Sequence, residues 1–303
     1  MKRRIILHAF QWTLSDIRMN LGKIKDCGYN AVQISPISPT KDESSSEFWM
    51  LYQPIAFTVG NKQIGSRDEL IQLCEEARFF DIDIIADVVL RHFGGKDTGE
   101  LIPHEKSDQR IVANPDYWLP VFENYDFENR LNVTHGCFGL PAINYFHHDV
   151  QDAYIAYLDD LIACGVSSFR IDMGKHFALP EEGCNFWTYV IGRYKDRFNY
   201  AENLHCSIEM QDAYAQYVGI LGSPCSDNNK YVSHFETHDT YYTFYSTKGI
   251  SDIERLERWS MLLNENKHAL WFSRPFDSVT FSDEMKTLNQ AALVSDTYAL
   301  VYA

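Results

Sequence analysis

The chain has 303 residues, enough for one large domain or two small ones, and its hydrophobic content of 45% is normal for a packed globular protein. Its 42 acidic residues outnumber its 27 basic ones, and the formal net charge of -15 repels nucleic acid and anionic membranes. No apolar run approaches the roughly 20 residues that a membrane-spanning helix needs. We therefore expect neither a nucleic-acid nor a membrane partner, and the charge is compatible with a neutral substrate.

The first third of the chain alternates short apolar strands with helical patterns. Strands are predicted over residues 5–10, 30–36 and 82–90, and helices over 14–28 and 66–80. Ser66 and Glu69 have the spacing of a capping box at the start of the second helix. The opening RRIILHAF is interpreted as a strand because its apolar part is shorter than the h-region of a signal peptide.

A long irregular stretch over 93–142 is rich in Gly, Pro, Asn and Asp, and its length is typical of a functional insertion. Beyond it the alternation resumes. Helices are expected over 149–165, 184–198, 212–221, 252–265 and 283–293, and strands over 167–172, 204–210, 231–236, 268–272 and 297–303. This alternation indicates a parallel sheet, with a (β/α)8 TIM barrel as the leading prediction and a doubly wound open sheet as the alternative.

Seven cysteines are scattered through the sequence without a CxxC pair. The odd count and the scatter argue against a disulfide framework and against a zinc site. Mostly buried free thiols in a reducing compartment are the favoured interpretation. We therefore expect a cytoplasmic protein, with an extracellular location as the alternative.

Acidic side chains stand at or near the carboxyl ends of four predicted strands, namely Asp87, Asp172, Glu209 and Asp239. Barrel enzymes place their active sites on that face. Carboxylates crowded around one barrel mouth repel one another, so some must be protonated or paired, which is the setting for acid–base chemistry. In SSFRIDMGKH (167–176), Arg170 and Asp172 point to the same side of a strand. Taken alone, Arg170 and Asp172 would be interpreted as a structural ion pair. The carboxylates at the other strand ends favour a role for this pair in catalysis.

Four segments resemble, in order, the four sequence blocks of the α-amylase family of glycoside hydrolases. They are ADVVLRH (86–92), SSFRIDMGKH (167–176), SIEM (207–210) and FETHD (235–239). WMLYQP (49–54) is similar to the aromatic segment before the first block, and GLPAIN (139–144) to the motif that ends the family's inserted domain. The combined motifs are highly specific, and the resemblance covers nearly all of the chain. The resemblance therefore implies a retaining hydrolase on a (β/α)8 barrel.

The resemblance implies a role for each matched carboxylate. Asp172 is expected to be the nucleophile, Glu209 the general acid and then the base, and Asp239 the residue that grips substrate hydroxyls. Arg170 would keep Asp172 ionised, whereas Glu209 has no basic neighbour in sequence and could stay protonated. A retaining glycosidase needs this pair of protonation states on carboxyl groups about 5–5.5 Å apart. Asp87 is expected to be architectural, fixing Arg170 or the loop.

The resemblance also implies a set of substrate-binding residues. Tyr52 would stack on the sugar, Trp49 would line a neighbouring subsite, His92 and His238 would bond the same sugar, and Lys175 and His176 would contact the leaving-group side. Aromatic rings with polar partners suit sugars, which present apolar faces and polar edges. The alternatives are that Tyr52 and Trp49 pack under a loop and that Lys175 and His176 form the first turn of a solvated helix.

Three positions depart from ion sites that members of the family carry. Arg91 stands where many have an asparagine ligand for calcium, and Ala142 where they have an aspartate. Calcium takes about six to eight oxygen ligands, so we expect no calcium and hypothesise that the Arg91 guanidinium occupies the ion's place. Thr237 stands where chloride-dependent members carry asparagine, so we expect no chloride dependence and no cofactor.

The spacing of the blocks also predicts a reduced barrel. Only 30 positions separate Glu209 from Asp239, so one βα unit near strand six is expected to be missing or shortened, with ILGSPCSDNN (220–229) as its scar. The expected organisation is a catalytic barrel over 1–92 and 143–295, an inserted loop domain over 93–142, and a vestige of a C-terminal β-domain over 296–303.

The predicted activity is hydrolysis of α-1,4-glucosidic bonds in starch-like glucans or malto-oligosaccharides by double displacement. The Lys175–His176 pair after the nucleophile resembles endo-acting amylases. Two alternatives stay open: a glucan transglycosylase with the same triad, and a non-catalytic carbohydrate-binding or partner-binding relic of the fold. The presence of all three carboxylates argues against the relic.

Overall fold

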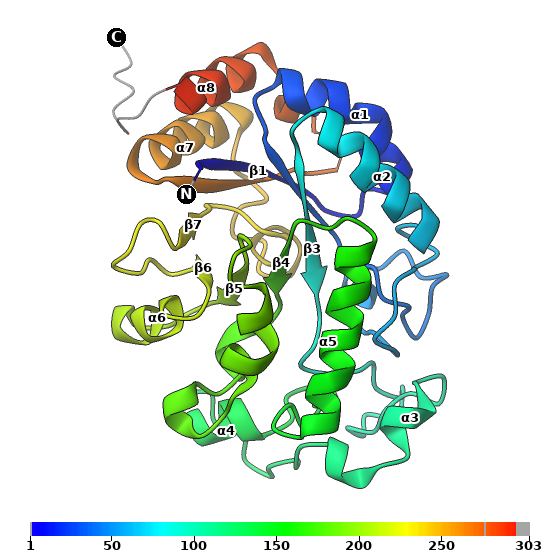
Figure 1. Cartoon of the computed structure of the whole chain (residues 1–303). Coiled ribbons are helices and arrows are strands. Elements are labelled where there is room, and N and C mark those ends of the chain that lie inside the picture. The colour runs from blue at the N-terminus through cyan, green and yellow to red at the C-terminus, as the bar shows by residue number, and fades with distance from the viewer. Residues whose placement is uncertain (1, 276, 295–303) are drawn as a thin grey trace.

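Eight parallel strands form a closed barrel, which confirms the (β/α)8 prediction and rules out the open sheet (Figure 1). The structure is a computed structural model that describes residues 2–275 and 277–294. Every strand pairs in parallel with its sequence neighbour, and β8 closes on β1. The strands are β1 (Arg4–Ala9), β2 (Ala31–Ile34), β3 (Asp83–Val88), β4 (Ser168–Ile171), β5 (Tyr200–Asn203), β6 (Gly219–Gly222), β7 (Tyr231–Ser233) and β8 (His268–Phe272).

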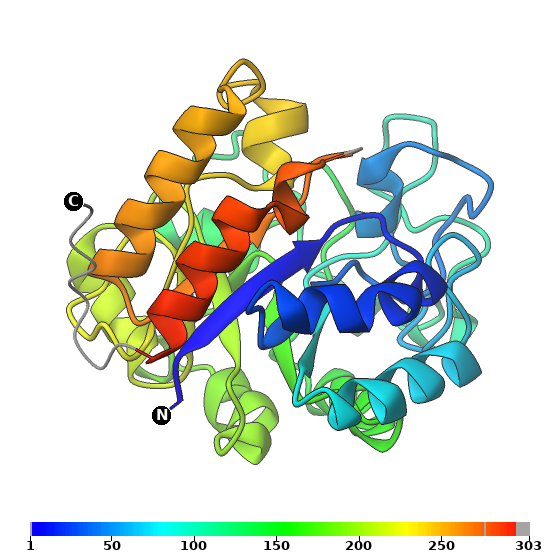
Figure 2. The same ribbon diagram turned by 90° about the horizontal axis from the view of Figure 1, so that it is seen from above.

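Helices cover the outside of the barrel, and Figure 2 shows α8, α1 and α2 following one another around it. The longer helices are α1 (Leu14–Asp26), α2 (Arg67–Phe79), α5 (His148–Ala163), α6 (Ile208–Ala215), α7 (Asp252–Glu265) and α8 (Asp283–Val294). Local sequence explains their ends, since the predicted capping box of Ser66 and Glu69 starts α2. In the described part of the chain, no helix has the length and apolar character required to span a membrane.

The barrel interior has an apolar layer below a polar one. The apolar layer consists of fully or nearly buried side chains, among them Ile6, Ile85 and Tyr200. Side chains two positions further along a strand point to the same face, so His8, Asp87 and Glu202 form the next layer toward the carboxyl ends of the strands. The short strands therefore place polar groups on the face where barrel enzymes work.

The region after β4 differs from the prediction. Residues 204–210, expected to be a strand, lie after β5, and the Ser207 hydroxyl caps the start of α6 by accepting from the Met210 N–H. Residues 219–221, the end of the helix expected over 212–221, lie in β6. All eight strands are therefore present, so the βα unit expected to be missing or shortened is shortened and not missing. The shortening is confined to residues 223–230, a loop that joins β6 to β7 without a helix.

The chain between β4 and β5 and the inserted segment are largely irregular. The helix expected over 184–198 is a π-helical turn, η5 (Phe186–Val190), followed by a 3-10 turn, η6 (Ile191–Tyr194). The helices of the inserted segment are short: α3 (Gln109–Val112), α4 (Arg130–His135) and the 3-10 turn η2 (Pro115–Tyr117). Both α3 and α4 lie at the end of the molecule toward which β3 and β4 point (Figure 1). The predicted strand at 297–303 lies outside the described residues. All seven cysteines are described and are free thiols.

Candidate active site

One buried guanidinium joins three carboxylates at the carboxyl end of the barrel. Asp87 on β3 and Arg170 on β4 are paired in register, and Asp172 follows β4 on the same side as Arg170. Arg170 Nη1 donates to Asp87 Oδ1 and to Asp172 Oδ1, both at 2.7 Å. Arg170 Nη2 forms an ion pair with Glu202 on β5. The pair recognised in the sequence is therefore part of a four-residue cluster.

Burial and shared charge set the protonation of this cluster. Burial raises the pKa of Asp172 well above its ordinary value, while the Arg170 guanidinium opposes the rise. Burial also raises the pKa of Asp87 to about 6, although Arg170 and the Tyr52 hydroxyl both bond to it. The charge of Arg170 thus favours the ionised form of Asp172, as predicted. Three carboxylates share this charge, however, so it does not cancel the rise in the pKa of Asp172 that burial causes. The cluster retains a proton to higher pH than isolated carboxylates would.

Glu209, predicted to be the general acid, does not lie with the other carboxylates. It is exposed in the first turn of α6, and the cavity that contains Asp172 is not lined by it. Backbone and Ser207 hydrogen bonds lower its pKa, contrary to the expectation of a protonated group. The strand was misplaced because LHCSIEM is more apolar than the real four-residue strand. Glu202, which sequence reasoning missed, lines that cavity.

Asp239, the third predicted carboxylate, opens a short π-helical turn, η7 (Asp239–Thr243), after β7. Its side chain is 28% exposed, and its Oδ1 lies 3.8 Å from His238 Nε2. Burial raises its pKa, although the Arg170 charge opposes this shift. Asp239 lines the same cavity as Asp172 and Glu202, so three carboxylates from three strand ends face one space.

This cavity has a volume of about 500 Å³, and aromatic rings make up much of its wall. Ring faces and scattered polar groups are the lining that sugars favour. Four phenylalanines and His205 line the cavity although the sequence did not indicate them as site residues. The lining residues outside the carboxylates include Phe48, Trp49, Tyr52, His92, Phe127, Phe138, Lys175, His176, His205, His238 and Phe244.

Tyr52, His92 and His238 form a packed wall beside the carboxylates. The Tyr52 hydroxyl donates to Asp87 Oδ2 at 2.9 Å, and its ring stacks on His238 with centroids 4.9 Å apart. His92 Nε2 donates to the Tyr52 carbonyl oxygen at 2.8 Å. Burial lowers the pKa of His92 to about 4 and that of His238 to about 3. Both imidazoles are therefore neutral near pH 7 and can donate or accept hydrogen bonds without adding charge.

Lys175 and His176 lie in a 3-10 turn, η3 (Gly174–His176), which begins two positions after Asp172. This turn lines the cavity, so the alternative of a solvated helix start is wrong. Lys175 Nζ donates to the Leu204 carbonyl at 2.9 Å, and His176 Nδ1 lies 3.1 Å from the Val133 carbonyl. Burial lowers the pKa of His176 to about 3. Trp49 also lines the cavity and is 42% exposed.

The backbone beside the carboxylates adopts an uncommon conformation. Met173, between Asp172 and η3, has φ 52° and ψ 41°, a left-handed conformation that a side chain makes costly. Gly174 follows, and a Cβ there would lie 2.5 Å from Asn203 Oδ1 and 2.6 Å from Ala201 Cβ. This close approach to β5 holds η3 against the strand that carries Glu202.

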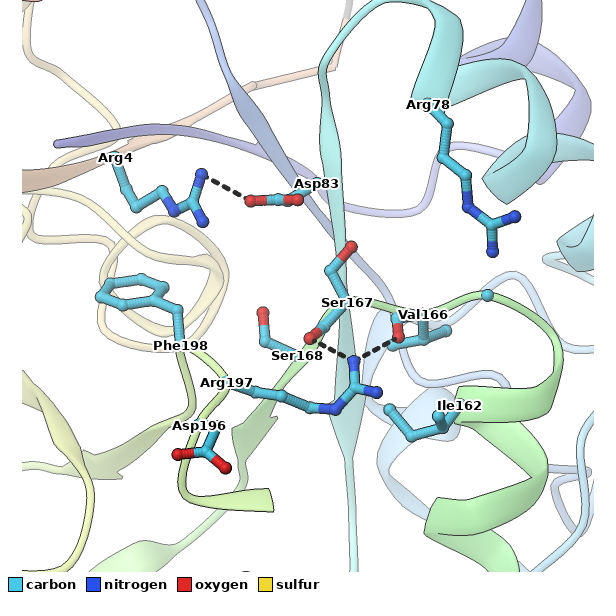
Figure 3. Close-up of a pocket in the computed structure, with 11 residues that line it drawn as sticks. Arg4, Arg78, Asp83, Ile162, Val166, Ser167, Ser168, Asp196, Arg197 and Phe198 are labelled. Carbon is cyan, nitrogen blue, oxygen red and sulfur yellow. Dashed lines mark hydrogen bonds and ion pairs between the residues drawn. The ribbon is translucent and has the colours of Figure 1, made fainter. Parts of the chain in front are cut away.

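A second pocket, of about 410 Å³, lies at the amino ends of β1, β3 and β4 (Figure 3). It is at the opposite end of the barrel from Asp172 and Glu202. Arg4 Nη1 pairs with Asp83 Oδ2, and Arg197 Nη1 donates to the Ser167 carbonyl at 3.0 Å. Its lining is mainly polar. Arg4 bonds from β1 to β3, and Arg197 bonds to the residues that lead into β4. We assign this pocket a structural role.

Comparisons with known proteins agree with the fold and the motifs. No family model matches the chain. An α-amylase of Clostridium acetobutylicum is 29% identical over 313 residues, which cover 92% of this chain and 41% of that protein. The α-amylase of Geobacillus thermoleovorans, solved in complex with acarbose, has a TM-score of 0.75 at 15% identity, over 98% of this chain and 79% of its own. A cyclomaltodextrin glucanotransferase, CldA, has a TM-score of 0.73 at 13% identity, over 93% and 72%.

The two solved structures share the barrel, and the Clostridium protein shares sequence along most of the chain. The chain spans less than half the length of the curated relatives it matches, 41% of that protein and 30% of an α-amylase from Butyrivibrio fibrisolvens. The chain is thus similar in sequence to α-amylases over most of its length, and its closed eight-stranded barrel is the fold of the solved α-amylase structures.

Proposed function

We propose that this protein hydrolyses α-1,4-glucosidic bonds in starch-like glucans or malto-oligosaccharides with retention of configuration. The observation that carries the proposal is that Asp172 and Glu202 contact neighbouring nitrogens of one guanidinium while facing one cavity. Such an arrangement favours the short separation of retaining enzymes, about 5–5.5 Å, over the roughly 6.5–9.5 Å that inverting enzymes need to admit a water molecule.

In the proposed reaction, Asp172 in its carboxylate form attacks the anomeric carbon, while Glu202 acts as the general acid and gives a proton to the departing glycosidic oxygen. The bond to the leaving sugar breaks as the covalent glycosyl-enzyme bond forms. Glu202, now ionised, then takes a proton from water, whose oxygen attacks the anomeric carbon and releases Asp172. Arg170 stabilises the negative form of Asp172 before attack and after release. Asp239 grips the sugar hydroxyls at the cleaved bond.

The cavity wall supplies the proposed substrate contacts. Tyr52 stacks on the sugar at the cleaved bond, and neutral His92 and His238 bond its hydroxyls. Trp49, the most exposed of the predicted contacts, offers a ring face to a neighbouring sugar. Lys175 and His176, which follow Asp172 in the turn, contact the leaving-group side.

The direct test is to incubate the protein with soluble starch and with maltoheptaose, and to follow reducing ends, product lengths and, by NMR, the anomer first released. Hydrolysis with retention creates new reducing ends, and the α-anomer appears first. The variant Asp172→Asn should keep the melting temperature within a few degrees and lose turnover. Unchanged turnover in that variant, or β-anomer as the first product, would refute the assignment.

Glycosyl transfer is the second candidate, supported by the similar barrel of a cyclomaltodextrin glucanotransferase. In that reaction a sugar hydroxyl, in place of water, attacks the glycosyl-enzyme. The same incubation separates the two reactions, because transfer lengthens some chains without a matching gain in reducing ends. Binding of maltoheptaose with neither change would favour the non-catalytic relic.

We also infer that the reaction does not depend on chloride. The Thr237 N–H donates to Thr240 Oγ1 at 2.9 Å, and Thr237 Oγ1 accepts from the Thr240 N–H at 3.4 Å. Both groups are thus used within the turn before Asp239. Titration of chloride at constant ionic strength should leave kcat unchanged, and a saturable increase would contradict the inference.

A further inference from the structure

Arg91 is a buried cation of an unusual kind. It follows β3, is 2% exposed, and has no carboxylate within ion-pair distance among the residues that the structure describes. Buried arginines are nearly always paired, because an uncompensated charge in the interior is costly. The charge of Arg91 must therefore be balanced by neutral dipoles.

Backbone carbonyls from two separate parts of the chain supply those dipoles. Arg91 Nη2 donates to the carbonyls of Thr134 at 3.2 Å and Gly136 at 2.9 Å, at the carboxyl end of α4. Carbonyls at a helix end lack intrahelical donors and lie at the negative pole of the helix dipole. Arg91 Nε donates to the His176 carbonyl at 3.1 Å. The ring of Tyr145 faces the guanidinium carbon at 5.3 Å.

A second arginine makes the reciprocal connection. Arg130 begins α4, and its guanidinium donates to the carbonyls of Lys175 and Phe177. Together with Arg91 on His176, the two arginines bind three successive carbonyls of the turn that follows Asp172. His176 Nδ1 completes the connection through its contact with the Val133 carbonyl. The inserted segment and the cavity wall are thus joined mainly through two guanidinium groups.

The residues at this junction do not fit the calcium ion that the family resemblance implies. Position 91 offers a cation and position 142 a buried methyl group, and neither donates an oxygen ligand. Within the described residues, no group of three or more His, Cys, Asp or Glu side chains could hold a metal ion. The Arg91 guanidinium already donates hydrogen bonds to carbonyls of the inserted segment and of the turn η3.

We propose that Arg91 is a built-in cation that fastens the inserted segment to the barrel and holds His176 in the cavity wall, so that activity needs no bound metal ion. Arg91 is then a positioning residue, since it reaches the substrate site only through the η3 backbone. The activity part of this proposal rests on the proposed glucan hydrolysis, whereas the structural part does not.

The test compares Arg91→Ala with Arg67→Ala, a matched control that removes an arginine paired with Asp160 outside the site. Hydrogen exchange should rise at the amides of 133–137 and 174–177 only in the Arg91 variant. Its kcat/KM for maltoheptaose should fall on the order of 10²-fold, the effect that a 1 Å misplacement can have. Methylguanidinium should restore part of both readouts, and methylammonium should not.

Arg91→Lys keeps the charge without the planar fork, and it carries the test if Arg91→Ala fails to fold. It should show intermediate exchange at the same amides. Wild-type protein in excess chelator should keep its melting temperature and its exchange pattern. Equal local exchange in the Arg91 and Arg67 variants, or a wild-type melting temperature lost in chelator and restored by calcium, would overturn the proposal. If wild type lacks hydrolysis, the exchange data still decide the structural part.

Discussion

The two ends of the barrel use the same kinds of residue for different purposes. At the amino end, Arg4 pairs with one carboxylate, Asp83, and both side chains keep partial contact with solvent. At the carboxyl end, Arg170 is buried and shared by three carboxylates that cannot all be neutralised by it. A matched pair only supports the fold, whereas an excess of buried acid can hold and move a proton.

The largest predicted effect distinguishes two glutamates that are seven positions apart in sequence. Glu202→Gln removes the proposed proton donor at the carboxyl end and should lower kcat by about 10²- to 10⁴-fold, the usual contribution of a general acid. Glu209→Gln, on the exposed face of α6, should leave kcat unchanged. Initial rates on maltoheptaose measure both. The reverse pattern would restore the assignment made from the sequence.

A smaller effect concerns the acid limb of the pH–rate profile. The negative charge of Asp87 contributes to the raised pKa of Asp172, so Asp87→Asn should lower that pKa. Activity requires ionised Asp172 and falls as pH drops through its pKa, so the acid limb of kcat should move to lower pH. Asp83→Asn at the amino end should leave the limb in place. An acid limb that moves to higher pH in Asp87→Asn, or that moves equally in both variants, would contradict the view that the charge of Asp87 raises the pKa of Asp172.

Trp49 tests the aromatic wall of the cavity, whereas the amino-end pocket has a single aromatic ring in its lining, that of Phe198. Trp49→Ala removes one ring face at a neighbouring subsite, worth about 0.5–1.5 kcal/mol, so KM for maltoheptaose should rise about 2- to 10-fold with little change in kcat. Maltotriose, which reaches fewer subsites, should be affected less. An equal loss for both substrates would place Trp49 at the cleaved bond.

The smallest predicted effect is at the amino end. Asp83→Asn breaks a partly exposed ion pair with Arg4, and such pairs contribute about 0–1 kcal/mol to stability. Denaturant unfolding should show a loss within that range, and kcat/KM should equal that of wild type. A large loss of activity would mean that the two ends are coupled.

Much of the site could be predicted because strand ends and motifs agree. Asp172 and Asp239 follow strands whose apolar residues are recognisable, and the i, i+2 relation of Arg170 and Asp172 survives in the structure. The position of β5 was predicted wrongly. This strand has only four residues, and because all four are buried they show no alternation of apolar and polar side chains. Ser207, three positions before Met210, carries the helix-capping signal that would have excluded a strand there.

Other features depend on contacts between distant parts of the chain. The sequence marked Arg91 as unusual, but its carbonyl partners lie 43 to 85 positions away. Which aromatic side chains reach the cavity was equally inaccessible, because Phe127 and Phe138 come from an inserted segment with little regular structure. Periodicity indicates which face of an element is buried, and it does not say where an irregular segment lies.

The missing helix between β6 and β7 has a consequence for how the barrel assembles. Ile220 pairs with Tyr231, so these parallel strands meet after only a short connection. The entropy lost in closing a loop grows with its length, and most other neighbouring strands in this barrel are separated by longer crossovers. The pairing of β6 with β7 should therefore form early in folding. The remaining strands of the barrel can then add to the free edges of this strand pair.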